Sequence, residues 1–143
     1  MKKPSEMVAD SDIYIFKEGV KPLWEDQANK NGGYFNVRIE KKKSNKIWEN
    51  LMLLTVCPMK DNGSWINGIR LKIKEENDTM QIWVCFGDSE RDKLEAMKTY
   101  LKDNLQITDD KAFKYLSISY HLKNLSSKND KPTFYPKKWS DVE

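Results

Sequence analysis

The stretch 66-INGIRLKIKEENDTMQIWVCF-86 contains two alternating segments separated by a polar turn at residues 76–78. Successive side chains of a β-strand point to opposite faces, so this alternation predicts two half-buried strands joined as a hairpin. In the first strand the apolar face contains Ile69, Leu71 and Ile73, and the other face contains Arg70, Lys72 and Lys74. In the second strand the apolar face contains Met80, Ile82, Val84 and Phe86, and the other face contains Gln81, Trp83 and Cys85.

Trp83 is out of phase with the apolar residues of its own strand. Paired antiparallel strands bury their apolar sides against the same core, so Trp83 is predicted to share the other face with the basic residues. The hairpin therefore predicts a sheet with one apolar face and one polar, basic face that contains an indole.

Segments outside the hairpin complete the sheet and cover it. Alternation predicts strands at residues 12–16, 34–41 and 113–122, and helical spacing predicts long helices at 44–57 and 89–105. The predicted fold class is α+β, with a curved antiparallel sheet of about five strands whose apolar face is backed by the two helices.

The composition indicates one domain of ordinary size. The chain has 143 residues, of which 38% are hydrophobic, and no internal repeat. We expect a mobile tail at residues 1–12 and a single domain at 13–143, with a flexible basic loop from about residue 123. The 25 basic and 22 acidic residues leave a net charge of +3. This charge is too small for a general nucleic-acid binder, so any basic site must come from local clustering.

The residue types argue against catalysis. His121 is the single histidine and has no nucleophile or acid arranged near it in sequence, so we expect no catalytic triad, metal site, cofactor or enzymatic activity. Cys57 and Cys85 lie in apolar runs, which is typical of buried thiols in a reducing compartment. No leader or membrane-spanning segment is recognisable, and we expect a soluble protein of the cytoplasm or nucleus.

The loop 21-KPLWEDQANKNGGYF-35 places Trp24 beside the carboxylates of Glu25 and Asp26. One interpretation is that Trp24 is a packing anchor beneath the loop. The other is that the indole stacks on a flat ring whose paired N–H donors bond to the neighbouring carboxylate, as the edge of guanine could. Anion contacts from the basic face would then suit a purine nucleotide. The residues alone leave both interpretations open.

Three segments together carry a resemblance: 14-YIFKEGVKPLWEDQANKNGGYFNVRI-39, 47-IWENLMLLTV-56 and 80-MQIWVCF-86. They resemble the eukaryotic translation initiation factor 4E family, the messenger-RNA cap-binding proteins. The similarity runs from about Tyr14 towards the C-terminus. It implies a curved sheet backed on its convex face by helices, with the ligand held in the concave face.

The resemblance also implies roles by position. Trp24 would stack on the cap, Glu25 would bind the guanine edge, and Trp83 would contact the N7-methyl group. Lys74 stands where the family has a phosphate-binding arginine, which keeps the charge but loses the bidentate fork. Glu76 stands where the family usually has a further phosphate-binding lysine.

Other residues are expected to compensate for these departures. Lys72 and Lys128 are expected to contact the phosphates. Family members carry, before the segment that matches Tyr14, a first strand, a loop with the second stacking tryptophan and a partner-binding helix, and the sequence given has no counterpart of these. Trp139 is expected to supply the second stacking ring, because the family's C-terminal loop lies beside the cap.

The helix at 44–57 is the remaining part of the family's partner surface. Trp48, Leu51 and Leu54 are expected to bind the scaffold initiation factor or its competitors, although the spacing of Trp48 alone favours a core anchor. The strand at 12–16 would be left at an unpaired sheet edge, which favours a homodimer.

Two functions follow as expectations. The first is binding of the 7-methylguanosine cap of mRNA in translation initiation. The alternative is a regulator or decoy that keeps the fold, does not bind the cap, and binds translation-factor partners through its helical face.

Overall fold

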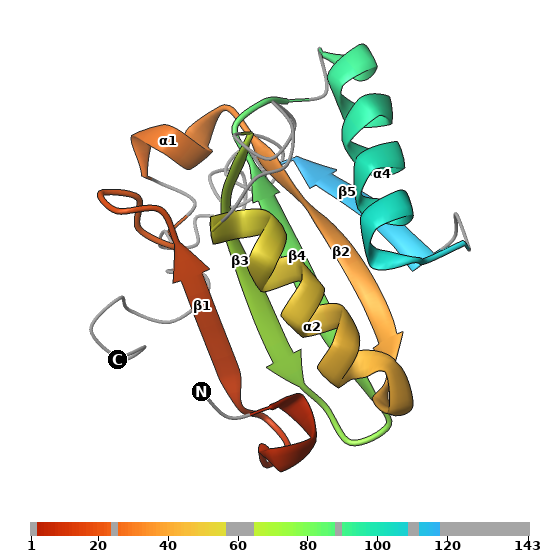
Figure 1. The fold of residues 1–143 in the computed structure, drawn as a ribbon. Coiled ribbons are helices and arrows are strands. Elements are labelled where there is room, and N and C mark those ends of the chain that lie inside the picture. The colour runs from red at the N-terminus through yellow and green to blue at the C-terminus, as the bar shows by residue number, and fades with distance from the viewer. Residues whose placement is uncertain (1–2, 24–25, 57–64, 88–89, 109–111, 118–143) are drawn as a thin grey trace, which may run out of the picture.

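The computed structural model describes residues 3–23, 26–56, 65–87, 90–108 and 112–117. Within them, five strands form one antiparallel sheet in the order β1-β3-β4-β2-β5 (Figure 1). The strands are β1 (Asp12–Phe16), β2 (Gly33–Glu40), β3 (Ile66–Ile73), β4 (Asn77–Val84) and β5 (Phe113–Ser117). All the expected strands are present, and residues 118–122 of the last one lie outside the described residues.

Two long helices, α2 (Lys41–Val56) and α4 (Arg91–Leu105), cover the same face of the sheet (Figure 1). Their apolar stripes and the apolar side of the strands form the main core, which confirms the predicted α+β class. Its largest fully buried members are Trp48, Leu51, Ile66, Ile69, Leu71, Ile73, Met80, Ile82, Met97 and Leu101. None of the helices in the described ranges is long and apolar enough to cross a membrane.

Helix α2 begins earlier than the sequence predicts, directly after β2. Ser44 lies within the first turn of the helix, and its Oγ donates a hydrogen bond of 2.6 Å to the buried carboxylate of Asp78 in β4. Lys41 makes an ion pair with the same carboxylate. Two contacts from the first turn of α2 to β4 therefore fix the start of the helix on the sheet.

Residues 3–11, which belong to the tail expected from the sequence, make contacts with α2 and β3. A single 3₁₀ turn, η1 (Pro4–Glu6), contacts α2, and the Ser5 N–H donates to Asn45 Oδ1 at 3.0 Å. Backbone hydrogen bonds join Asp10 and Ser11 to Ile73, which continues the pairing of β1 with β3. Among the described strands β1 pairs only with β3, so it is an edge strand and the homodimer through this edge stays a prediction.

Candidate functional site

The face of the sheet opposite the helices contains Trp83. In the register of the sheet, Trp83 pairs with Tyr34 on β2 and with Gly68 on β3. The Tyr34 ring stacks on the indole at 5.6 Å between centroids, and Phe16 of β1 meets its edge at 5.2 Å. A Cβ at Gly68 would lie 2.2 Å from the Phe16 ring, so glycine is required for this aromatic cluster to close. The prediction that Trp83 shares a face with Arg70 is confirmed.

Trp83 is more enclosed than a half-buried strand residue. Its side chain is 0% exposed, and the indole N–H donates to Gln81 Oε1 at 3.1 Å. Burial raises the pKa of the neighbouring Tyr34 hydroxyl, and the charge of Arg70 opposes this shift. A ligand can therefore contact the Trp83 ring only if side chains that pack on it, such as Tyr34 and Phe16, move aside.

Arg70 has a structural partner on this face. Its guanidinium forms an ion pair of 2.9 Å with Asp12 of β1, and the two side chains are 4% and 9% exposed. The guanidinium also lies over the Tyr14 ring at 5.3 Å. Among the basic residues of the hairpin, Arg70 thus contributes to the packing of β1 on β3.

The two predicted phosphate ligands of the hairpin occupy different positions. Lys72 lies on β3, half-buried, on the face of Trp83. Lys74 lies beyond the end of β3, in the exposed turn, and not on the strand face. With a rise of about 3.3 Å per residue, Lys72 is roughly 13 Å and Lys74 roughly 20 Å along the chain direction from Gly68, the partner of Trp83. The geometry favours Lys72 as the nearer phosphate ligand.

The other predicted ligand residues, Trp24, Glu25, Lys128 and Trp139, lie outside the described residues. The residues on both sides of positions 24–25 are nevertheless fixed by side-chain hydrogen bonds.

Asn29, in the single-turn helix α1 (Gln27–Lys30), organises the segment on either side of those positions. Its buried Nδ2 donates to the carbonyl oxygens of Lys21 at 2.8 Å and Leu23 at 2.9 Å. Its Oδ1 accepts from Asn67 Nδ2 of β3 at 3.1 Å. The Lys21 N–H donates to Asp26 Oδ2 at 3.2 Å. Residues 21–23 and 26–30 are therefore bonded to each other and, through Asn29 and Asn67, to the sheet. Sequence periodicity could not identify this pair of asparagines.

The predicted partner residues of α2 need correction. Leu51 and Leu54 are buried in the main core because they face the sheet, so they offer no surface to a partner. The exposed apolar side chains of this helix are Leu53 and Val56, at 54% and 63%.

Trp48 is also buried, but it lines a cavity of about 410 Å³ between η1 and α2. Pro4 and Met52 line the same cavity, with Lys3, Lys46 and Glu49 at its polar side. The Trp48 indole N–H finds no acceptor among the described residues. All three predicted partner residues are therefore buried, and of the three only Trp48 lines this cavity.

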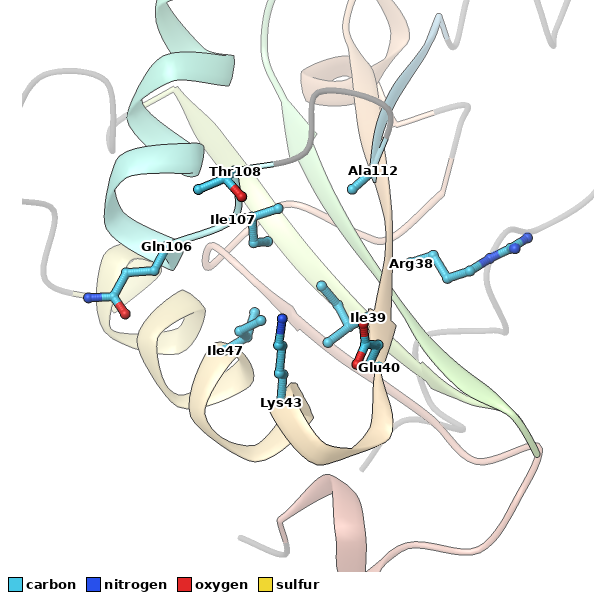
Figure 2. Close-up of a pocket in the computed structure, with 9 residues that line it drawn as sticks. All are labelled: Arg38, Ile39, Glu40, Lys43, Ile47, Gln106, Ile107, Thr108 and Ala112. Carbon is cyan, nitrogen blue, oxygen red and sulfur yellow. The ribbon is translucent and has the colours of Figure 1, made fainter.

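A second cavity, of about 180 Å³, lies on the helix side of β2 (Figure 2). Ile39, Ile47, Ile107 and Ala112 supply apolar walls, and Lys43 and Glu40 supply charge. No residue predicted to bind a ligand lines it. Among the described residues no group of three or more His, Cys, Asp and Glu side chains is placed to hold a metal ion.

Comparison with known proteins identifies relatives of this chain. The family model described as "Eukaryotic initiation factor 4E" matches residues 1–133. A wheat protein named "Eukaryotic translation initiation factor NCBP" is 39% identical over 83 residues, which are 58% of this chain and 36% of that protein. A Candida albicans "Eukaryotic translation initiation factor 4E" is 30% identical over 119 residues, which are 79% of this chain and 56% of that protein. The chain thus spans roughly one third to just over one half of these relatives.

Two solved structures are similar over most of the chain. A complex of Caenorhabditis elegans eIF4E-3 with the 4E-binding protein Mextli and a cap analog has a TM-score of 0.76 and 26% identity, covering 94% of this chain and 73% of that one. A complex of Ascaris suum eIF4E-3 with the m7G cap has a TM-score of 0.70 and 28% identity, covering 82% and 67%. The family model and the shared fold together establish that the chain belongs to the eukaryotic initiation factor 4E family.

Proposed function

We propose that this protein binds the 7-methylguanosine cap of mRNA and acts in translation initiation. The observation that carries the proposal is the common face of Trp83 and Lys72, an indole and a cation on one side of the sheet. Similar folds are known in complex with a cap or cap analog, which supports the same ligand class here.

In this proposal each residue has one role. Trp24 stacks on the methylated base, whose positive charge strengthens the contact by cation–π attraction. Glu25 accepts the two N–H donors of the guanine edge. Trp83 contacts the methyl group, and Lys72 holds phosphate. The protein is a binding factor and not an enzyme, and it acts in the cytoplasm or the nucleus.

Partner binding is proposed for the outer side of α2. Exposed Leu53 and Val56 supply apolar contact, and Pro4 and Met52 in the cavity beside buried Trp48 extend this apolar surface. A solved complex of a similar protein contains a 4E-binding protein, which supports a scaffold factor or its competitors as the partner class.

Tryptophan fluorescence tests the cap proposal. Titration with 7-methyl-GTP is expected to quench the fluorescence strongly and unmethylated GTP much less, because only the methylated base is cationic. Trp24→Ala should lose the quenching. Trp65→Phe should keep it, because Trp65 packs on Phe86 at 5.4 Å, in the apolar core outside the proposed site. A folded sample that shows no methyl-dependent quenching would contradict the proposal.

Asn29 offers a second test through the loop it holds. Asn29→Ala leaves the Lys21 and Leu23 carbonyls without their donor, so we expect the affinity for 7-methyl-GTP to fall about ten-fold or more. The matched control is Asn45→Ala, which removes the two hydrogen bonds between Asn45 and Ser5 of η1 and should leave affinity unchanged. Equal affinities of Asn29→Ala and wild type, measured by calorimetry, would show that Asn29 does not position the loop.

A further inference from the structure

The face that contains Trp83 continues past the proposed cap site as a row of cations. On β2, Arg38 pairs with Thr79 of β4, and Lys72 of β3 pairs with the same Thr79 from the other side. Adjacent strands are about 4.8 Å apart, so the two cations flank Thr79 across roughly 10 Å. Threonine is small and places no bulky side chain between them.

Lys114 of β5 extends this row. It pairs with Asn36, which lies two residues before Arg38 on the same face of β2. Arg38 and Lys114 are both exposed. Figure 2 shows the Arg38 side chain extending away from the cavity on the helix side of β2, while Ile39 points into that cavity. The row therefore runs from Lys72 through Arg38 towards Lys114 and leaves the proposed cap site on the β5 side.

The described acidic residues of β1 and β2 nearest this row are already engaged. Asp12 lies opposite Lys72 in the register, but its carboxylate is held by Arg70. Glu40, at the end of β2, lines the cavity on the helix side and forms an ion pair with Lys42 at 3.4 Å. No ion pair to Arg38 or Lys114 occurs within the described part of the chain.

The exposed Glu75 and Glu76 bound this row at the β3–β4 turn. A polyanion that follows the cations is therefore directed across the sheet towards β5 and away from the turn.

We propose that Arg38 and Lys114 bind the phosphates of the RNA nucleotides that follow the cap. The inference rests on the proposed function, because the cap sets where the RNA chain begins. Single-stranded RNA is the ligand that fits, since its phosphates repeat along a flexible chain and a row of separated cations tracks such a backbone. The sequence pattern does not assign this role, because Arg38 and Lys114 are far apart along the chain and meet only through β2–β5 pairing.

The experiment compares 7-methyl-GTP with a capped, unstructured RNA of about eight nucleotides, a length within the range that single-strand grooves bind. Affinities are measured over a series of salt concentrations for wild type and for the double variant Arg38→Gln/Lys114→Gln. We expect wild type to bind the capped RNA on the order of ten-fold more tightly than 7-methyl-GTP at about 0.1 M salt. The double variant should lose this gain, with the salt slope for the RNA smaller by about 1.4, and should bind 7-methyl-GTP as wild type does.

A matched control removes the same two charges from the helix side of the protein. Lys43→Gln/Arg91→Gln alters exposed residues of α2 and α4, and it should keep the RNA affinity and slope of wild type. An equal loss in the control would overturn the inference, because net charge alone would then explain the effect. Absence of any gain from the RNA over 7-methyl-GTP would also overturn it.

The design separates the two proposals. If 7-methyl-GTP binds and the RNA adds nothing, the cap proposal stands and the RNA path is wrong. If 7-methyl-GTP fails to bind while RNA binds through Arg38 and Lys114 with or without a cap, the basic row stands and the cap proposal is wrong. If neither ligand binds the folded protein, both are wrong.

Discussion

Glu25→Ala is expected to lower the affinity for 7-methyl-GTP roughly a hundred-fold, because two charge-assisted hydrogen bonds worth about 3 kcal/mol together are lost. The variant should keep weak, stacking-dependent binding through Trp24. The sharper measurement compares 7-methyl-GTP with the 7-methylinosine analogue, which lacks the exocyclic amino group. Wild type should discriminate between them by about ten-fold, and Glu25→Ala should not discriminate.

Glu18→Ala is the matched control, since it removes an exposed carboxylate from the turn after β1. It should preserve both the affinity and the discrimination of wild type. If Glu25→Ala still distinguishes the two nucleotides as wild type does, Glu25 is not the residue that binds the guanine edge.

Asp12→Ala is expected to reduce the free energy of unfolding by about 3 kcal/mol, because it leaves the buried Arg70 guanidinium without its carboxylate. The loss should be measured by urea denaturation followed by circular dichroism. The double variant Asp12→Leu/Arg70→Met removes both charges and fills a similar volume, so it should recover most of the lost stability.

The control for this prediction is an exposed pair. Glu40→Ala breaks the Glu40–Lys42 ion pair, whose side chains are 59% and 76% exposed, and should change stability by less than about 0.5 kcal/mol. A loss for Asp12→Ala no larger than that of Glu40→Ala would show that the buried pair does not hold β1 to β3.

Several features of the site follow from alternation alone. The phase of Trp83 against Ile82 and Val84 is a local property of one strand, so its face could be predicted before any pairing was known. The same holds for the burial of Trp48 by an apolar helical stripe. The expectation of a cap ligand came instead from the family resemblance of the Trp24 loop, because the spacing of apolar residues says nothing about the ligand.

Other features depend on contacts between distant segments. Lys74 shares the phase of Lys72, but the strand ends at Ile73, so only the length of the turn decides which lysine stays on the face. Leu51 and Leu54 were expected at a partner surface, and packing of α2 against the sheet buries them instead.

The sequence by itself determined the α+β class, the two faces of the sheet and the side on which Trp83 lies, because each follows from a short-range period. Only the tertiary structure decided that Arg70 is neutralised by Asp12 and that Arg38 and Lys114 share one row, because these depend on which strands are neighbours. Strand order brings together residues many positions apart, and nothing in a local pattern specifies it.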